Sequence, residues 1–449
     1  MNHDCIVGKV SIQSHAMESE RSISSIIEHP LFKSLRQQDR SFILECSRRC
    51  SLTFQQGRQL VEWAADLALW QEKLLEQLWD ESKGSTLGGK ARIKAIIGAL
   101  QDYIDSIRQN PIDYSSFSEP ELIQTKNITV IEDSSDIVLL GRCPCPVSGE
   151  KTRCCNLVTL DAVQQCAFGC SYCSIQAFYH QNEVRVFGDL GKRLDSIVLD
   201  DTVWHVGTGQ SSDSLLLGDD YGTLSALIRL ARRYPDTIFE LKTKSRRTDW
   251  INIFDVPSNI VATWSLNAPT IIMKEEHLTA TLEQRLDAAQ AAAEAGIMIG
   301  FHIHPMVWFD DWKEEYKRLI DEICTRFSPQ QVLMISFGTL TFTKPALRQL
   351  RKSGRPTKVS AIELTESAGK YSYPETIKRD LFGHAYSCFP DEWKNETGPF
   401  FYLCMELPSL WMPVFGRMYA DNAAFESDMR RAYRSKLAAW EGSVDKKTI

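Results

Sequence analysis

Short apolar strand patterns alternate with amphipathic helix patterns over most of the chain from residue 137 onward. The strand patterns are rich in apolar or β-branched residues, and the segments between them repeat their apolar residues with helical spacing. Alternation of this kind predicts parallel strands joined by right-handed helical crossovers. Six such units predict an α/β fold, a partial (β/α)6 barrel. The expected strands are VTLDAV, VWHVGTG, FELKTKS, IVATWSLNA, IMIGFHIHP and VLMISFGTL. The expected helices include TLSALIRLARRY, LEQRLDAAQAAAEAG and WKEEYKRLIDEICTRF.

The chain has 449 residues, enough for more than one domain. Helical periodicity in LVEWAADLALWQEKLLEQLW and KARIKAIIGALQDYIDSIRQ predicts an amino-terminal helical module. The expected division is a helical module and linker over residues 1–130, the barrel over 131–345, and an irregular carboxyl-terminal extension over 346–449. We expect this extension to be a substrate-binding region.

Composition places the chain among proteins that work in water. Hydrophobic residues make up 43% and charged residues 24% of the sequence, and no apolar stretch approaches the roughly 18 residues of a membrane span. The amino terminus shows no apolar signal segment, so we expect a cytoplasmic protein without a membrane partner. The net charge of −7 argues against unspecific coating of nucleic acid. The run KPALRQLRKSGRPTK, residues 344–358, is either a solvated face or a local site for a phosphate backbone.

Three of the thirteen cysteines stand close together in CAFGCSYC, at Cys166, Cys170 and Cys173. They follow the first expected barrel strand, and the chemistry of parallel barrels collects at the carboxyl ends of their strands. Clustered thiols in a reducing compartment favour metal binding over disulfides. A structural zinc site normally has four Cys or His ligands, whereas three thiolates can hold three irons of a [4Fe-4S] cluster. The fourth iron would then be open to another ligand.

With this CxxxCxxC loop, the sequence resembles the radical S-adenosylmethionine (SAM) superfamily. More narrowly, it is similar to the spore photoproduct lyase family, over about residues 157–350. The motifs that carry the resemblance are CAFGCSYCSIQ, GTGQSSDS, ELKTKS, TWSLNA, TATLEQRLDAA, GFHIHP, WKEEY and FTKPALRQL.

The resemblance implies an enzyme that cleaves SAM reductively at a [4Fe-4S] cluster and forms a 5′-deoxyadenosyl radical. By the same resemblance it is a carbon–carbon lyase in DNA repair, acting on a DNA photolesion or related base. Its electron would come from an external donor such as flavodoxin or ferredoxin. Two alternatives stay open: a radical SAM enzyme with a substrate other than nucleic acid, and a non-catalytic iron–sulfur protein that senses redox state or binds a partner.

The resemblance also assigns residues to the cofactor. It gives the cluster to the three cysteines and places Tyr172 against the adenine of SAM. Strand-end motifs that contact the methionyl and ribose groups match Ser212, Asp213, Lys244, Ser265 and Asn267. A lysine suits a carboxylate because its ammonium is a compact charge.

The chain departs from the family at two positions. Family members carry a hydrogen-donating cysteine after the second strand and a tyrosine right after the cluster loop; this chain has Gln210, or a close neighbour, and Ser174 there. Neither an amide nor a hydroxyl donates a hydrogen atom as readily as a thiol. The thiols that could take over are Cys324, Cys388 and Cys404.

Two further groups of residues have alternative interpretations. The segment RCPCPVSGEKTRCC either holds a second metal or contains buried thiols that act as small apolar residues. Its cysteines are Cys143, Cys145, Cys154 and Cys155. Three histidines on expected strands either line a pocket or are hydrogen-bonded core residues. They are His205, His302 and His304.

Overall fold

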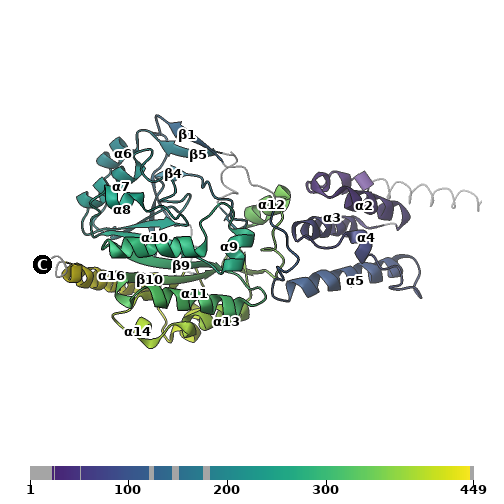
Figure 1. Cartoon of the computed structure of the whole chain (residues 1–449). Helices are drawn as coiled ribbons and strands as arrows, with labels where there is room; N and C mark the ends of the chain where they lie inside the picture. The colour runs from purple at the N-terminus through teal and green to yellow at the C-terminus, as the bar shows by residue number, and fades with distance from the viewer. Residues whose placement is uncertain are drawn as a thin grey trace, which may run out of the picture. The chain divides into compact units, whose positions relative to one another are not determined.

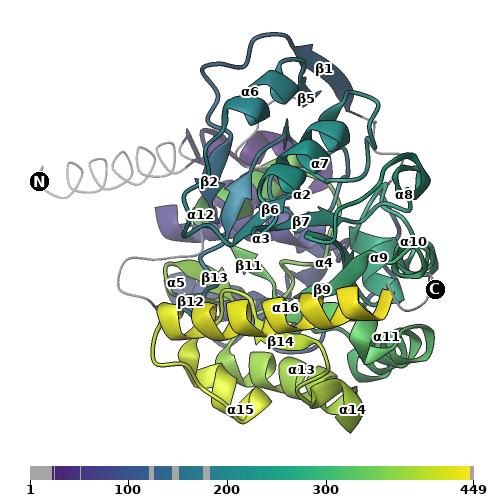
Figure 2. The same cartoon turned by 90° about the vertical axis from the view of Figure 1, so that its left-hand side faces the viewer.

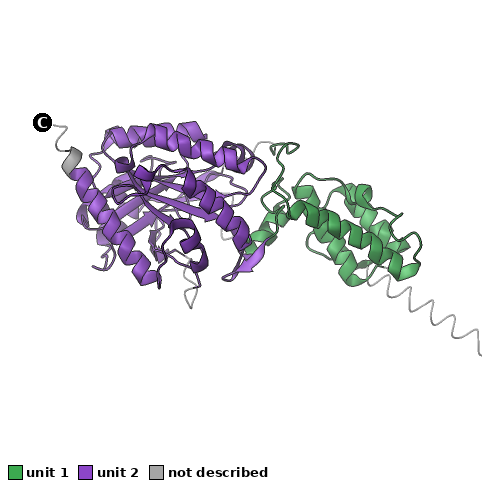
Figure 3. Cartoon of the chain, turned by 90° about the horizontal axis from the view of Figure 1, so that it is seen from below, with its two compact units in different colours: residues 1–121, 344–363 green, residues 122–343, 364–449 purple. Residues whose placement is uncertain are grey.

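The computed structural model of the protein describes residues 23–24, 26–50, 52–120, 126–143, 151–174 and 183–444. The chain forms two compact units. The smaller unit comprises Met1–Glu121 with Lys344–Glu363, and the larger one comprises Leu122–Thr343 with Leu364–Ile449 (Figure 3). No helix in the described ranges has both the length and the apolar character that crossing a membrane requires.

The larger unit is built on one curved eight-stranded sheet (Figure 1). Seven neighbouring strands run parallel, and only the edge strand β2 is antiparallel. Their order across the sheet is β14 (Phe400–Leu403), β10 (Val332–Thr339), β9 (Met298–Met306), β8 (Ile260–Leu266), β7 (Ile238–Thr243), β6 (His205–Thr208), β3 (Val158–Leu160) and β2 (Leu140–Arg142). All six expected barrel strands are present, which confirms the prediction of a partial α/β barrel.

The crossover helices lie where their periodicity predicts them. They are α7 (Thr223–Arg233), α10 (Leu282–Glu294) and α11 (Trp312–Arg326). Helix α10 begins with a capping box, in which the Thr281 hydroxyl accepts from the backbone of Gln284 and the Gln284 side chain accepts from that of Thr281. The other helical segments of this unit are α6 (Leu190–Ser196), α8 (Asp249–Ile253), α9 (Pro269–Glu275), η3 (Pro329–Gln331), α13 (Glu375–Cys388), α14 (Asp391–Lys394), η4 (Pro408–Leu410) and α15 (Trp411–Phe415).

Two small sheets flank the barrel. One contains β1 (Asn127–Ile131), β5 (Glu183–Phe187) and β4 (Val163–Gln164), and the other β11 (Thr341–Phe342), β13 (Lys370–Ser372) and β12 (Thr365–Ser367).

The last helix, α16 (Asn422–Val444), crosses the amino-terminal ends of the barrel strands (Figure 2). The Trp440 indole N–H donates to the carbonyl of Gly296, just before β9, over 2.9 Å. The Trp204 indole N–H, just before β6, donates to Glu426 over 2.8 Å. The helix therefore covers the amino-terminal opening, whereas the cysteine loop follows the carboxyl end of β3.

The smaller unit is helical, as its sequence predicts. Its elements are η1 (Phe32–Ser34), α2 (Gln37–Arg49), α3 (Phe54–Leu69), α4 (Leu75–Leu78), α5 (Gly89–Arg108) and α12 (Lys344–Ser353). The apolar face expected on α3 is buried at Leu60, Ala64 and Leu67, against Leu100 and Ile104 of α5.

The basic run 344–358 is only partly a solvated face. Arg351 forms two hydrogen bonds of 2.7 and 2.9 Å with the buried carboxylate of Asp66. Lys358 is buried and donates to Glu72 over 3.0 Å. Arg348 remains exposed on α12. Part of the positive charge in this run is therefore used inside the helical unit.

Candidate functional site

The cysteine loop lies directly after β3 and β4 and is held by the segment that follows α9. The backbone N–H of Gly169 donates to the carbonyl of His277 over 2.9 Å, and that of Ser171 donates to Glu275 over 2.8 Å. The Ser171 hydroxyl also lies 3.2 Å from the His277 ring. These contacts fix the loop beside the carboxyl end of the sheet. The loop carries the expected cluster ligands Cys166, Cys170 and Cys173.

The three thiols suit a thiophilic metal by chemistry, although they do not form a ready-made coordination shell. In the described ranges, no three His, Cys, Asp or Glu side chains are gathered closely enough to hold a metal ion. Burial raises the pKa of Cys166 well above its ordinary value and that of Cys170 to about 12, and the negative charges of neighbouring groups add to both shifts. A thiol gives up its proton when it binds a metal. A bound cation would therefore offset the cost of ionising these buried thiols. The donor set therefore fits an iron–sulfur cluster held by three cysteines.

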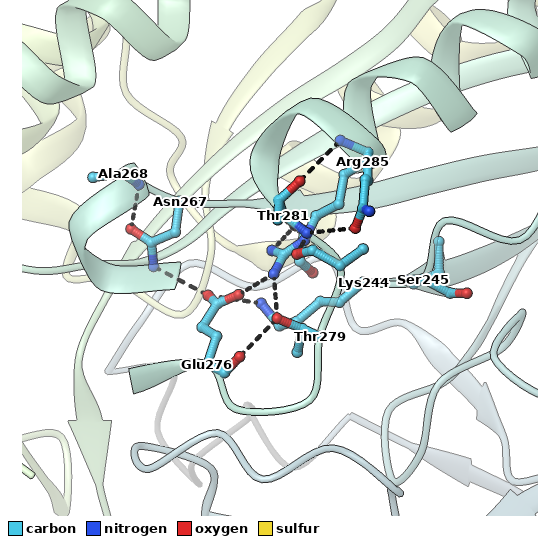
Figure 4. Close-up of polar contacts among 12 residues, drawn as sticks. Lys244, Ser245, Asn267, Ala268, Glu276, Thr279, Thr281 and Arg285 are labelled. Carbon is cyan, nitrogen blue, oxygen red and sulfur yellow. Dashed lines mark hydrogen bonds and ion pairs between the residues drawn. The ribbon is translucent and has the colours of Figure 1, made fainter. Parts of the chain in front are cut away.

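Most of the polar residues expected around SAM come from the carboxyl ends of β6, β7 and β8. Figure 4 shows Lys244 after β7 and Asn267 after β8 turned toward one carboxylate, Glu276. The Lys244 ammonium lies 3.2 Å from this carboxylate. The hydroxyl of Tyr172, from the cysteine loop, donates to the same carboxylate. Glu276 thus joins the cysteine loop to two neighbouring strand ends.

Two cations surround the buried Glu276 carboxylate. The Arg285 guanidinium donates to Glu276 over 2.6 Å, and both side chains are fully buried. Burial alone would raise the pKa of Glu276, but the charges of Arg285 and Lys244 and the hydrogen bonds hold it at about 2. The guanidinium also donates to the carbonyls of Ala280 and Ser265 and to the Thr279 hydroxyl, at 2.9, 2.8 and 2.7 Å. The Arg285 guanidinium thus donates its hydrogen bonds to groups of the protein. Lys244 is the more accessible cation, with 16% of its side chain exposed.

The Asn267 side chain is locked in one orientation. Its amide nitrogen donates to the carbonyl of Pro305 over 2.9 Å and to Glu276 over 3.4 Å. Its amide oxygen accepts from the backbone of Ala268 at 2.9 Å and from the Tyr316 hydroxyl at 3.0 Å. The residue is fully buried, and its bonds tie the end of β8 to the end of β9.

Asp213 fixes the turn after β6 to the end of β7. Its carboxylate accepts from the backbone of Lys244 at 2.6 Å and from the Thr243 hydroxyl at 2.8 Å, besides two backbone groups of its own loop. The turn has Gly209 at φ +76°, where a Cβ would stand 2.7 Å from the carbonyl of Lys242. Asp213 therefore holds the backbone that presents Lys244.

The remaining expected residues stand at the same edge of the sheet. Ser212 is half-buried in the turn after β6, and Ser265 is half-buried at the end of β8. Gln210 lies in the turn after β6, and its amide nitrogen is buried without a hydrogen-bond partner among the residues that the structure describes. Ser174 is the last described residue of the cysteine loop.

Sequence reasoning did not single out the two most buried charges of the site. Arg285 lies within the motif TATLEQRLDAA, but the sequence assigned it no role. Glu276 sits in an irregular segment after α9, and no periodicity or spacing marked it. A charged residue buried by tertiary contacts leaves no local signal in the sequence.

The three histidines on strands form a hydrogen-bonded network inside the barrel. His302 lies 2.6 Å from the Glu240 carboxylate and 2.7 Å from the Ser336 hydroxyl, which lies 2.8 Å from His304. His205 lies 3.1 Å from the second oxygen of Glu240. Burial lowers the pKa of His302 and of His304, which opposes protonation of these rings.

Comparison with known proteins identifies related sequences. Residues 255–379 match the family model described as spore photoproduct lyase. The chain is 34% identical over 113 residues to the spore photoproduct lyase of Bacillus subtilis, which covers 24% of this chain and 32% of that protein. It is 22% identical over 250 residues to the one of Clostridium acetobutylicum, 54% of this chain and 71% of that protein. It is 30% identical over 112 residues to the one of a Geobacillus species, again 24% of this chain and 32% of that protein.

Solved structures of the same name are also similar. A spore photoproduct lyase complexed with dinucleoside spore photoproduct has 18% sequence identity and a TM-score of 0.47, covering 62% of this chain and 82% of that one. A mutant with bound AdoMet and the same dinucleoside has 18% identity, a TM-score of 0.48 and the same coverage. The alignments to the Bacillus and Geobacillus relatives thus span about a third of those proteins. The family model and these relatives support the expected resemblance to the spore photoproduct lyase family over part of the chain.

Proposed function

We propose, from the similarity of the chain to spore photoproduct lyases, that it is a radical SAM enzyme of that family. In this proposal Cys166, Cys170 and Cys173 hold a [4Fe-4S] cluster. When bound, the cluster would supply one electron to the sulfonium of SAM, which releases methionine and a 5′-deoxyadenosyl radical. A flavodoxin- or ferredoxin-type protein would provide that electron.

The observation that carries this proposal is the charge balance beside the cysteine loop. Glu276 contributes one negative charge, and Arg285 and Lys244 contribute two positive charges. The three groups together carry one excess positive charge in a largely buried place. A buried charge is costly unless it is paired, so the cluster of side chains favours one added anion. The carboxylate of SAM would satisfy Lys244, which is the accessible cation.

The surrounding residues would orient SAM and keep water away. Asp213 holds the backbone of Lys244, and Asn267 is fixed by four hydrogen bonds. The Tyr172 ring lies 5.8 Å from the Lys244 ammonium, beside which an adenine could stack. Ser212 and Ser265 offer hydroxyls at the same edge of the sheet for the ribose and methionyl groups.

Anaerobic reconstitution tests the radical chemistry directly. The chain, loaded with iron and sulfide, is incubated with SAM and dithionite, and 5′-deoxyadenosine and methionine are measured by chromatography. We expect both products, and their loss when the three loop cysteines are replaced by alanine. Absence of 5′-deoxyadenosine from a preparation whose iron content and absorption show a [4Fe-4S] cluster would refute the proposal.

We propose a DNA photolesion as the substrate, in line with the relatives. Arg348 and Lys352 are exposed one helical turn apart on α12 and offer two phosphate contacts. Binding to irradiated DNA should exceed binding to intact DNA, and removing both side chains should reduce the salt slope of binding by about two. Equal binding to both DNAs and no change of the lesion on turnover would remove this substrate.

A second substrate class is favoured by one observation. The turn after β6 carries Gln210, with a buried amide lacking a partner in the described residues. By the resemblance, Gln210 or a close neighbour stands where family members have a hydrogen-donating cysteine. A buried amide nitrogen without a partner suits a hydrogen-bond acceptor on the substrate, and a turn without a thiol favours a reaction in which no hydrogen atom is returned from this position. The test is to supply other modified nucleosides and compare the amounts of 5′-deoxyadenosine formed.

A further inference from the structure

Three chain segments meet at the seam where the half-barrel closes. The backbone N–H of Arg153 donates to the carbonyl of Glu406 over 2.9 Å, in an antiparallel bridge. The Arg153 guanidinium donates to the carbonyls of Tyr419 and Ala420. Because β3 follows residue 153 and β14 precedes residue 406, this bridge joins the two sides of the open sheet.

Thiols gather at this seam from the segments of Arg153 and Glu406 and from the end of β2. Cys154 and Cys155 follow the bridging Arg153, and Cys404 precedes the bridging Glu406 by two positions. Cys143 continues the antiparallel pairing of β2 with β3, since its N–H donates to the carbonyl of Leu157 over 3.0 Å. The backbone thus brings these thiols into one neighbourhood, although Cys404 is separated from Cys155 by about 250 positions in the sequence.

The electrostatics of the thiols agree with this placement. A hydrogen bond from Cys154, together with burial and the neighbouring Cys404 and Cys143, raises the pKa of Cys155 well above its ordinary value. Burial and the neighbouring Cys143 and Cys154 raise the pKa of Cys404.

A lysine inside the barrel provides a counter-charge for thiolates. Despite burial, Glu240 and the neighbouring thiols Cys143, Cys155 and Cys404 raise the pKa of Lys242. Its ammonium lies 3.6 Å from the Glu240 carboxylate. A metal bound by three or four thiolates carries net negative charge, which this ammonium offsets. Thr152 and Met405, neighbours of these thiols in the sequence, line a small cavity beside the seam.

We propose that the seam is a second metal centre, in which Cys143, Cys155 and Cys404, with Cys154, bind a thiophilic metal. Zinc ions and iron–sulfur clusters are both coordinated by cysteine thiolates. Each thiol that binds releases its proton to the solvent. The sulfurs are not gathered into a closed shell in the part of the chain that the structure describes, so binding turns the side chains toward one ion. Cys145 of the same motif lies outside the described residues.

A metal centre would keep its metal through purification, whereas a core of buried thiols would contain none. The test uses the full chain with Cys166→Ala, Cys170→Ala and Cys173→Ala, so that the expected cluster site is absent. Zinc, iron and sulfide per chain are measured after anaerobic purification. We expect one metal centre to remain: zinc without sulfide indicates a zinc site, and iron with sulfide and visible absorption indicates a cluster. This outcome does not depend on SAM chemistry, so failure of the proposed function would leave it unaffected.

Removal of the seam thiols provides the decisive comparison. Cys155→Ala with Cys404→Ala, added to the same chain, should abolish the retained metal. The matched control is Cys324→Ala with Cys388→Ala, on α11 and α13, which should leave the metal content unchanged. The changes at Cys155 and Cys404 could also unfold the chain, so circular dichroism is recorded for this variant. In addition, Co²⁺ is added to the chelator-treated chain in which only the three loop cysteines are replaced. A thiolate-to-cobalt absorption band is expected. Absence of both retained metal and this band, or equal metal in the folded double variant, overturns the proposal.

Discussion

At the scale of single residues, the candidate site is organised by one carboxylate, Glu276, which the resemblance does not assign to SAM. Glu276 holds Lys244, Asn267 and the Tyr172 hydroxyl in one place, and Arg285 keeps it ionised. The residues expected to touch SAM could be predicted because they belong to short motifs at strand ends. Glu276 and Arg285, which organise these residues, could not be predicted, because their burial depends on contacts between α9, α10 and the cysteine loop.

Replacing Lys244 by glutamine tests its role as the anion-binding cation. A hydrogen bond to a charged group contributes about 1.5–3 kcal/mol, so SAM should bind roughly 10- to 100-fold more weakly by equilibrium dialysis. Lys192→Gln, an exposed change on α6, is the matched control and should bind as the parent does. Unchanged affinity of the Lys244 variant would show that SAM's carboxylate is bound elsewhere.

Glu276→Gln tests the electrostatic argument through pH. The pKa of Glu276 in the folded chain, about 2, lies below its ordinary 4.5, so the ionised group stabilises the fold above pH 4.5. This contribution fades as the pH falls from 4.5 toward 2, by about 3 kcal/mol in all. At pH 7 the variant should be about 3–5 kcal/mol less stable, since Arg285 loses its buried partner.

Urea unfolding of the parent chain and the Glu276 variant at several pH values provides the measurement. The difference in unfolding free energy between them should shrink below pH 4.5, because only the parent has an ionisable group to lose there. A difference that stays constant down to the lowest accessible pH contradicts a depressed pKa at this residue.

At the scale of elements, periodicity located the segments that repeat one pattern. The strands β6–β10 and the helices α7, α10 and α11 have apolar residues in the spacing of their own element. Residues 364–444 were harder to predict, since β14 is only a four-residue strand, FFYL, and α14 and α15 have only four and five residues. Their place is set by packing against β10 and α11, which a local pattern does not record.

The helical unit has a buried charge cluster that joins α12 to α3. The Asp66 carboxylate accepts from Arg351 at 2.7 and 2.9 Å and from Arg108 at 3.0 Å. Asp66→Ala leaves both guanidiniums without this partner and should lower stability by about 3–5 kcal/mol. Urea unfolding followed by tryptophan fluorescence measures it, with the exposed Asp102→Ala on α5 as the control. Equal stability of the two variants would mean that the arginines reach water when Asp66 is removed.

At the scale of the whole molecule, the larger unit closes by contacts between segments far apart in the sequence. The seam at Arg153 and Glu406 joins the two sides of the sheet, and α16 covers the amino-terminal ends of its strands. Barrel architecture could be predicted from the alternation of strands and helices. The way in which a half-barrel is closed could not, because the closing residues are single contacts without a repeating pattern.

Tyr433 on α16 is where this closure can be tested most sharply. Its ring is 1% exposed and forms edge-on contacts with Trp204, just before β6, and with Phe400 of β14, at centroid distances of 5.9 and 6.0 Å. Tyr433→Ala should create a cavity between these elements and cost about 3–5 kcal/mol of unfolding free energy. Hydrogen exchange should accelerate in both β6 and β14, because both lose the ring that covers them. Tyr433→Phe keeps the ring and should change stability by no more than about 1.5 kcal/mol. Faster exchange in one of the two strands alone would show that the helix protects them separately and that the ring does not join them.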